Sequence, residues 1–387
     1  MEYVRLGTIV DLKQGLAINS KSNHLVVNID TGLYLLRIAD MSSGEKKVCM
    51  SLETPSRFIA TPEDIIYTRT GQVGLVFRNQ TGVVHNNCFR VIPLNDKVLS
   101  RDFLFWALKL KSVYEYANNI AAGSAQPDLP HSSFKRIRIP LPDLSTQQKI
   151  ASTLSAYDSQ IENNQKRIKL LEQMAENLYK EWFVRFRFPG YENAEFEGGL
   201  PKGWQRKNLT DIMIFQKGVE SGSDAYTEDK TLTPFFRVGD IEDKEPTYYV
   251  DINTLQKYQL VQPMDVLCSF DGTVGRVAIG LEGLYSSGMC KISPKNKNIS
   301  PAYVYYLMKS QPVQNTIQTF ANGSTILHAG KSIKKLQTYF EASVVKEYGE
   351  IATPILNEIL SLEKENRLLT HQRDLLLPRL MSGKLSI

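Results

Sequence analysis

The chain of 387 residues has no apolar run that approaches the ~18 residues needed for a membrane-spanning helix. Its first residues, MEYVRLGTIVDLKQG, include an acidic side chain and no apolar core of signal-peptide length, so we expect neither a membrane protein nor an exported one. Only four cysteines are present, and none forms a CxxC pair. Isolated cysteines fit reduced thiols and a cytoplasmic location.

Signatures of catalysis are also missing. The five histidines show no metal-ligand spacing. The segment AGKS at 329–332 lacks the glycine four residues before Gly-Lys that a phosphate-binding loop requires. The sequence EDK at 242–244 has the form of a nuclease half-motif, but no acidic partner is convincingly placed upstream. No glycine-rich methyltransferase loop and no NPPY-like tetrad occurs. We therefore predict no catalytic residue, no metal site and no bound cofactor in this chain.

The net charge of the chain says little about its binding partners. The chain has 46 Lys and Arg against 41 Asp and Glu, a net charge of +5. That excess is compatible with polyanion binding and also with many neutral proteins of this length. A hydrophobic content of 42% describes a folded protein, and 387 residues predict two or three domains.

A long helix is predicted within Ser145–Gly190. Ser145 and Gln148 match a capping box, and no Gly or Pro follows before Pro189. A helix over 146–185 would have 40 residues and a length of roughly 60 Å at ~1.5 Å per residue. Its apolar positions follow a heptad pattern with one central Asn. The predicted seam is Ile150, Leu154, Ile161, Asn164, Ile168, Leu171 and Leu178.

The chain contains an internal repeat of about 200 residues. The segment LGTIVDLKQG (6–15) recurs as LTDIMIFQKG (209–218), and PEDIIYTRTGQVGLV (62–76) recurs as PMDVLCSFDGTVGRV (263–277). Arg37 and Asp40 correspond in the same way to residues 237 and 240. Short β-branched runs beside Gly-containing turns predict strands, and 101–118 shows helical periodicity, so each copy is a mixture of helix and strand.

A second heptad segment ends the chain. Thr353 as N-cap with Pro354 at the first helical position predicts where this helix begins. Its seam includes Ile355, Ile359, Leu362, Asn366, Leu369 and Leu376. The two long helices could each pack on its own domain. We favour antiparallel pairing between them, with one Asn in each seam fixing the register.

These patterns predict an α+β fold. We expect two similar mixed α/β domains, residues 1–143 and 191–343. A pair of long antiparallel coiled-coil helices, within 144–190 and 344–387, would separate the two domains. The copies would be related by an internal pseudo-two-fold repeat.

Three segments resemble a known family. LYKEWFVRFRFPG (178–190), LPKGWQRKNLTDI (200–212) and HQRDLLLPRLMSGKL (371–385) are similar to the conserved regions of type I restriction-modification specificity subunits. The order of variable domain and helix resembles this family over the whole chain. Because the first domain begins almost at residue 1, we expect at most a minimal conserved segment before it.

The resemblance implies a non-catalytic subunit with two target-recognition domains. Each domain would read one half of an interrupted, asymmetric duplex DNA sequence, and the helices would set the spacing and bind methyltransferase (modification) subunits. S-adenosylmethionine is then expected on those subunits, and ATP with Mg²⁺ on a restriction/translocase subunit, if one is present. Half-sites on one DNA face would lie ~34–36 Å apart, about one helical turn.

Candidate DNA contacts are polar residues that differ between matched turns, together with basic runs. The candidates are Arg69, Gln72, Gln126, His131, Lys135, Arg136, Arg138, Phe270, Asp271, Thr273, Arg276, Thr325, His328, Lys331, Lys334 and Lys335. We assign phosphate anchoring to the Lys and Arg residues at 135, 136, 138, 334 and 335. Each candidate could equally be an ordinary surface residue.

Two further alternatives remain open from the sequence. The motifs GQVG (71–74) and GTVG (272–275) fit either a GxxG clamp on a nucleic-acid backbone or a turn that joins two strands. For the whole chain, the rival functions are a stand-alone DNA methyltransferase or nuclease and a protein scaffold that does not bind DNA.

Overall fold

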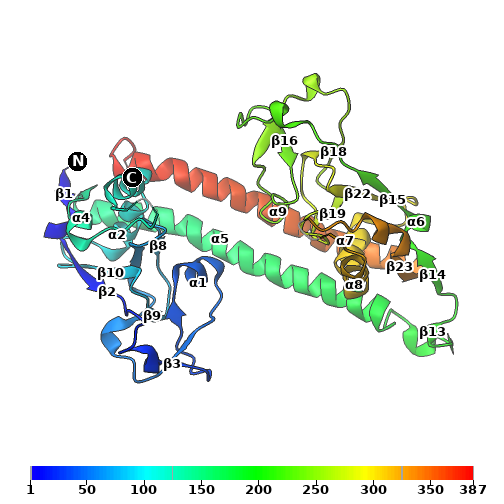
Figure 1. The fold of residues 1–387 in the computed structure, drawn as a ribbon, viewed down its shortest axis with the longest axis horizontal. Coiled ribbons are helices and arrows are strands. Elements are labelled where there is room, and N and C mark those ends of the chain that lie inside the picture. The colour runs from blue at the N-terminus through cyan, green and yellow to red at the C-terminus, as the bar shows by residue number, and fades with distance from the viewer. Residues whose placement is uncertain (1, 124, 324–325, 387) are drawn as a thin grey trace. The chain divides into compact units, whose positions relative to one another are not determined.

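Figure 1 shows the computed structural model, which describes residues 2–123, 125–323 and 326–386. The chain forms two compact units, Met1–Glu162 with Asn366–Ile387, and Asn163–Glu365. Each unit contains one copy of the repeat and part of both long helices. The domain boundaries that we predicted from the sequence stay predictions.

The first unit is built around a four-stranded antiparallel sheet in the order β2-β10-β7-β8. A smaller sheet, β4-β9-β6, contains one parallel pair, β4 with β9. The strands are β1 (Tyr3–Arg5), β2 (Val10–Gln14), β3 (Val26–Val27), β4 (Leu35–Leu36), β5 (Cys49–Met50), β6 (Ile59–Ala60), β7 (Ile65–Thr68), β8 (Val76–Phe77), β9 (Gly82–Val84), β10 (Cys88–Pro93) and β11 (Arg138–Pro140). The short helices are α1 (Ile38–Ser43), α2 (Arg101–Leu108), α3 (Lys111–Ile120) and α4 (His131–Phe134).

The second unit repeats this arrangement. Its main sheet has the order β15-β22-β19-β20, and its smaller sheet, β17-β16-β21-β18, again contains one parallel pair. The strands are β12 (Phe196–Glu197), β13 (Leu200–Pro201), β14 (Gln205–Asn208), β15 (Met213–Lys217), β16 (Thr233–Phe236), β17 (Tyr248–Val250), β18 (Leu260–Val261), β19 (Val266–Ser269), β20 (Val277–Ala278), β21 (Gly283–Tyr285), β22 (Met289–Pro294) and β23 (Gln337–Phe340). The short helices are α6 (Leu209–Ile212), α7 (Pro301–Lys309) and α8 (Gln311–Thr319). The repeat read from the sequence is therefore confirmed in three dimensions.

One inner strand of each main sheet, β7 or β19, is buried along its whole length, and its first three residues are apolar because both of its faces are covered. In β7, Ile65 and Tyr67 belong to the core beneath α2, whereas Ile66 belongs to a second core with Leu36 and Val84. Successive side chains of a strand point to opposite faces, so one short apolar run supplies two cores. The strand β19 divides its side chains between two cores in the same way.

The two long helices are α5 (Leu144–Tyr179), which continues as a π-helical turn over Lys180–Val184, and α9 (Ala342–Met381). In the first unit, Arg373 of α9 pairs with Asp158 of α5 at 2.6 Å, and Leu380 shares a core with Leu154. These contacts run antiparallel, since the residue numbers rise on one helix as they fall on the other.

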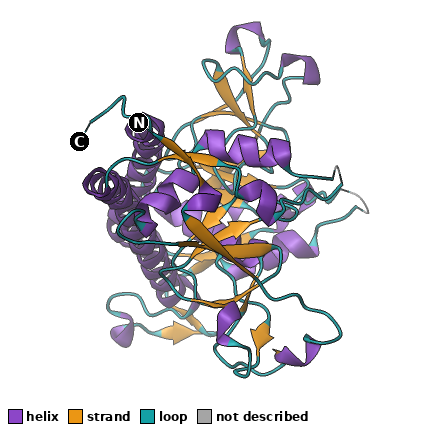
Figure 2. Ribbon diagram, turned by 90° about the vertical axis from the view of Figure 1, so that its left-hand side faces the viewer, coloured by secondary structure: helices purple, strands orange, loops and turns teal. Residues whose placement is uncertain are grey.

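The pairing has the same sense in the second unit. There Arg167 pairs with Glu358 at 2.6 Å, and the hydroxyl of Tyr348 donates to the carbonyl of Ala175 at 3.2 Å. The predicted antiparallel pairing is confirmed, and all thirteen predicted seam residues are buried or half-buried. In Figures 1 and 2 the two helices can be followed beside the strands and short helices that they carry in each unit.

The predicted helix starts were wrong. The carboxylate of Asp143, not Ser145, caps α5, because it accepts hydrogen bonds from the backbone N–H and the hydroxyl of Thr146 at 3.0 and 2.7 Å. The helix α9 begins at Ala342, eleven residues before the predicted start at Thr353. Pro354 is tolerated inside α9 because it is exposed, so the carbonyl that its missing N–H leaves without an intrahelical bond lies on the solvent side.

Among the described residues, no helix combines the length and apolarity that crossing a membrane requires.

Candidate nucleic-acid interface

In the first domain, the turn between β7 and β8 is hydrogen-bonded to the loop that precedes α4. The carbonyl of Arg69 accepts from the N–H of Leu129 at 2.9 Å, and the N–H of Gly71 donates to the carbonyl of Pro127 at 2.9 Å. We call residues 69–75 together with 122–123 and 125–129 the paired loops of this domain. Their backbone is fixed by bonds between segments that are almost 60 residues apart in the sequence.

The second domain has the same backbone scaffold. Its own paired loops are formed by residues 270–276 with 322–323 and 326–329. The N–H of Ala329 donates to the carbonyl of Phe270 at 2.7 Å, and the N–H of Gly272 donates to that of Leu327 at 2.9 Å. These bonds place Phe270 at the position that Arg69 occupies in the first domain. The same register matches Asp271 with Thr70, and His328 with Asp128. Two domains thus present different side chains on one scaffold.

Glycines shape the turn in both domains. Gly71 and Gly74 have φ values of +82° and +94°, and Gly272 and Gly275 have +73° and +86°. L-residues rarely adopt this left-handed region, so each GxxG motif is explained by the turn. A Cβ atom at Gly74 would also lie 2.7 Å from the ring of Tyr114. The turn interpretation is confirmed, and contact of GxxG with a nucleic-acid backbone stays a prediction.

A polar cluster lies on the paired loops of the first domain. Arg69 donates from Nε and Nη2 to the two carboxylate oxygens of Asp128, at 3.1 and 2.6 Å, and from Nη1 to Oε1 of Gln14 at 3.2 Å. The hydroxyl of Thr70 donates to Asp128 at 2.6 Å. The hydrogen bond from Arg69 holds the pKa of Asp128 below its usual value, so this carboxyl is ionised at neutral pH.

The second domain has a different cluster on its paired loops. Nδ1 of His328 lies 2.8 Å from Oδ1 of Asp271, and Nζ of Lys217 lies 3.8 Å from the other carboxylate oxygen. His328 is 60% exposed, so its remaining ring nitrogen is open to a ligand. Arg276 is paired with Glu242 at 2.7 Å. The structure therefore brings together Asp271 and His328, two candidates that are 57 residues apart.

Two residues of these clusters were missed from the sequence. Gln14 lies in β2 and Lys217 in β15, strands that each pair with the neighbour of the turn-bearing strand. The repeat aligns both residues one position before a matched glycine, and they differ between copies. This difference between the copies was the sequence signal by which both residues could have been chosen as candidates.

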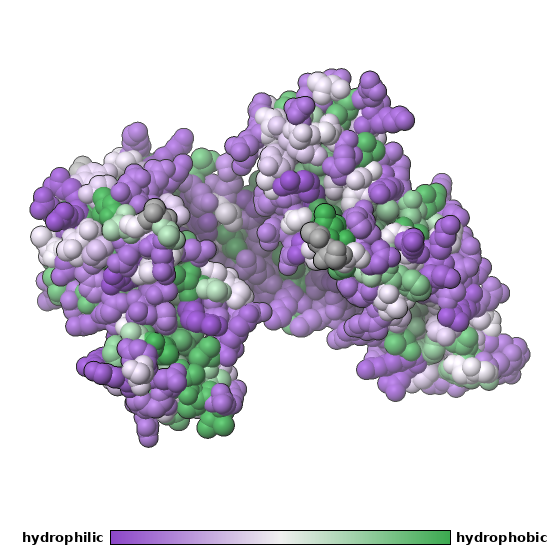
Figure 3. All heavy atoms as spheres, viewed as in Figure 1, coloured by the Kyte–Doolittle hydropathy of each residue, from purple (hydrophilic) through white to green (hydrophobic). Residues whose placement is uncertain are grey.

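Most of the other candidates are accessible. Gln72, Gln126 and Thr273 are exposed on the paired loops. Six basic candidates are exposed on the segments that follow, in or near α4, β11 and the 3₁₀ helix Gly330–Lys335: Lys135, Arg136, Arg138, Lys331, Lys334 and Lys335. On the face drawn in Figure 3, hydrophilic residues predominate, with small apolar patches between them.

Two other candidate residues pack against aromatic rings of their own domains. Phe270 is only 3% exposed and packs against Phe215, so the prediction that its side chain contacts DNA is wrong in this structure. The half-buried ring of His131 lies edge-on to Phe89 at 4.9 Å between centroids. Burial, and to a smaller extent the charge of Arg69, lowers the pKa of His131. The neutral form of the ring is therefore favoured, as expected for a side chain that packs against other residues. Thr325 lies outside the described residues.

Among the described residues, no group of three or more His, Cys, Asp or Glu side chains is placed to hold a metal ion. Burial raises the pKa of Cys88 to about 12 and that of Cys290 to about 11, which keeps these thiols protonated and unreactive at neutral pH.

Comparison with known proteins gives a consistent result. The family described as type I restriction modification DNA specificity domain matches residues 1–173 and 201–338. The chain belongs to this family. The MjaIX type I restriction enzyme specificity subunit of Methanocaldococcus jannaschii is 27% identical over 370 residues, which cover 90% of this chain and 83% of that protein. The HindI specificity subunit of Haemophilus influenzae is 23% identical over 405 residues, covering 83% and 86%.

The fold of this specificity-domain protein is also similar to a solved structure. The S subunit of a type I restriction-modification system from M. genitalium matches with a TM-score of 0.65 and 16% identity, covering 98% of this chain and 96% of that one.

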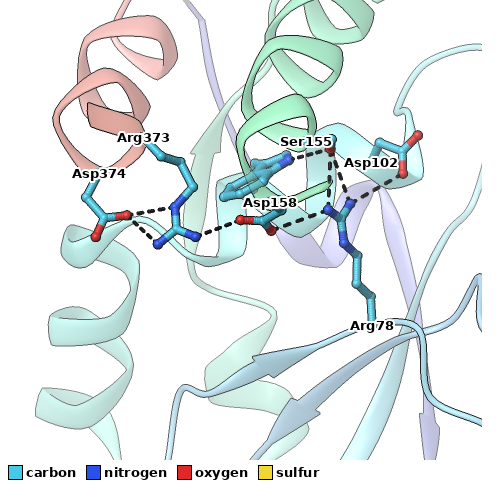
Figure 4. Close-up of polar contacts among 7 residues, drawn as sticks. Arg78, Asp102, Ser155, Asp158, Arg373 and Asp374 are labelled. Carbon is cyan, nitrogen blue, oxygen red and sulfur yellow. Dashed lines mark hydrogen bonds and ion pairs between the residues drawn. The ribbon is translucent and has the colours of Figure 1, made fainter. Parts of the chain in front are cut away.

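A polar network anchors the first specificity domain to both long helices (Figure 4). Asp158 of α5 accepts from Arg373 of α9 at 2.6 Å and lies 3.5 Å from Arg78, which follows β8. Nε1 of the buried Trp106 and the guanidinium of Arg78 both donate to the hydroxyl of Ser155, at 3.1 and 3.4 Å. One carboxylate thus sits between cations that come from a globular domain and from the other long helix.

We expect Asp158→Ala to lower the free energy of unfolding of the first unit by about 2–3 kcal/mol, because it leaves Arg78 and Arg373 largely buried without their shared carboxylate. Burial lowers the pKa of the nearby Lys109, and the charge of Asp158 acts in the opposite direction, so a third cation loses a favourable partner. Denaturant unfolding would measure the change. Asp11→Ala is the matched control in the same unit, because its pair with Lys13 is about half exposed and worth under ~1 kcal/mol. Equal losses for both variants would contradict the prediction.

Proposed function

We propose that this chain is the DNA-recognition subunit of a type I restriction-modification complex. Each domain reads one half of an interrupted, asymmetric duplex target. One observation carries the proposal: both domains hold the same paired-loop scaffold with different polar side chains on it. A common scaffold suits docking on a common DNA shape, and different side chains suit the reading of different bases. Membership of the specificity-domain family gives independent support.

In this proposal the chain has no catalytic role and acts in the cytoplasm. Methyltransferase subunits carry S-adenosylmethionine, and a restriction/translocase subunit, where present, carries ATP with Mg²⁺. The helices offer a surface for such partners. Leu170 of α5 and Leu368 of α9 are 64% and 53% exposed, and each lies 27 residues beyond the residue that caps its helix, Asp143 or Glu341. Exposed leucines at matched positions support docking of the same kind of subunit on both helices.

We expect the full chain with its methyltransferase subunits to bind duplex DNA with an affinity that falls at least tenfold between ~50 and ~200 mM salt. The physical reason is counterion release, because the exposed Lys and Arg residues of the candidate interface would neutralise phosphates. Fluorescence anisotropy over a salt series would measure it. A salt-insensitive or undetectable affinity would favour a protein scaffold, and methylation or cleavage by the chain alone would favour a stand-alone enzyme.

A further inference from the structure

We propose that Arg69 reads a guanine in the half-site of the first domain, and that Asp128 and Gln14 position its guanidinium for that contact. This inference rests on the proposed function and assigns one base contact within it. It starts from the polar cluster on the paired loops, where Arg69 is 22% exposed and Asp128 is 36% exposed.

The hydrogen bonds of Arg69 leave a specific part of the guanidinium available. A guanidinium has five N–H groups. Asp128 accepts one from Nε and one from Nη2, and Gln14 accepts one from Nη1. Two N–H groups therefore remain, one on each terminal nitrogen. Two donors on neighbouring nitrogens match the O6 and N7 acceptors that guanine presents in the major groove.

The ion pair also favours a base over a phosphate as the partner of Arg69. A phosphate contact depends mainly on net positive charge, and Asp128 cancels that charge at short range. Asp128 does not remove the directional hydrogen bonds that the two remaining N–H groups of Arg69 can donate. An arginine held by a carboxylate therefore keeps its capacity for bidentate recognition while contributing little to non-specific attraction.

Backbone hydrogen bonds hold the cluster in place without DNA. The backbone N–H of Arg69 donates to the carbonyl of Asn87 at 2.8 Å, and its carbonyl accepts from Leu129 at 2.9 Å. Asp128 exchanges two backbone hydrogen bonds with Ala122, both at 2.8 Å. A side chain that is already oriented loses little conformational entropy on binding, which strengthens the contact.

Among its described residues, the second domain has no arginine held by a carboxylate at this position. The buried Phe270 takes the place of Arg69 on the same scaffold, and Asp271 with His328 forms the polar cluster. The guanine contact by this route is thus confined to the first half-site. That asymmetry supplies an internal control, because a change at Arg69 should leave the second half-site as it was.

The experiment is selection of bound duplexes from a randomised pool by the full chain with its methyltransferase subunits, followed by sequencing. We expect the wild type to require guanine at one position of the first half-site. Arg69→Ala should reduce the affinity for the preferred site about 10- to 100-fold and remove the guanine requirement at that position only. Asp128→Asn should weaken the same requirement. Lys135→Ala, an exposed cation of the same domain, is the control and should weaken all sequences alike.

Arg69→Lys separates charge from geometry. Lysine keeps the positive charge but lacks the planar guanidinium that bonds Asp128 and presents two donors at once, so we expect binding with a weakened guanine requirement. An unchanged guanine requirement in Arg69→Lys and Arg69→Ala would overturn the assignment. A uniform loss over all sequences in Arg69→Ala would also overturn it and would identify a phosphate contact. Failure of the wild type to select any motif would overturn the proposed function itself.

Discussion

Insertion of one heptad into both long helices, after Glu162 in α5 and after Glu365 in α9, should widen the gap between half-sites by up to about three base pairs. Seven helical residues add roughly 10.5 Å at ~1.5 Å each, and one base pair occupies ~3.4 Å. Each helix is continuous across its insertion point, and both insertions keep the heptad phase. The half-sites themselves should stay unchanged, because no residue of the paired loops is altered.

The control for this experiment is the same insertion in α5 alone. The two helices pair in both units, through Asp158 with Arg373 and through Arg167 with Glu358. A single insertion cannot preserve both sets of contacts, so we expect a lower unfolding midpoint and weaker DNA binding. Sequencing of selected duplexes gives the gap length. An unchanged gap in a stably folded double-insertion protein would show that the helices do not set the spacing.

Phe183→Ala should lower the free energy of unfolding of the second unit by about 3–5 kcal/mol. Phe183 is 5% exposed and its ring contacts those of Tyr179 and Tyr303 at 5.0 Å, Tyr348 at 5.3 Å and Trp204 at 5.9 Å between centroids. Removing it leaves a cavity at the junction of the long helices with the second domain.

Urea unfolding followed by tryptophan fluorescence would measure this loss, since two of the chain's three tryptophans, Trp182 and Trp204, lie in the affected core. Val184→Ala changes the next residue, which is 48% exposed, and should cost no more than ~0.5 kcal/mol. A cost below about 1 kcal/mol for Phe183→Ala would mean that the aromatic cluster collapses around the gap and is not the anchor that its packing indicates.

The paired loops illustrate where sequence reasoning reached its limit. Comparison of the two repeats identified position 69 and its match at 270 as differing residues on equivalent turns. It did not show that Arg69 is 22% exposed and ion-paired while Phe270 is 3% exposed. Exposure depends on what packs against the turn, such as Phe215 against Phe270, and those residues are distant in the sequence.

The long helices also show what the sequence could predict and what it could not. The heptad pattern predicted both seams correctly because burial repeats with the period of the helix itself. The start of α9 was misplaced because Thr353 and Pro354 form a good local N-terminal signal, whereas the packing of Val345 and Tyr348 into the domain core extends the helix back to Ala342. Tertiary burial outweighed the cost of an internal proline on an exposed face.

The sequence by itself determined the repeat, the mixed helix and strand content, the two heptad seams and the family, because each is written as a local or periodic pattern of residues. Only the tertiary structure decided that Arg69 meets Asp128 and Gln14, which are 59 and 55 residues away, and that His328 meets Asp271. Such side-chain contacts depend on strand register and on backbone hydrogen bonds between loops. No spacing in the sequence encodes them directly.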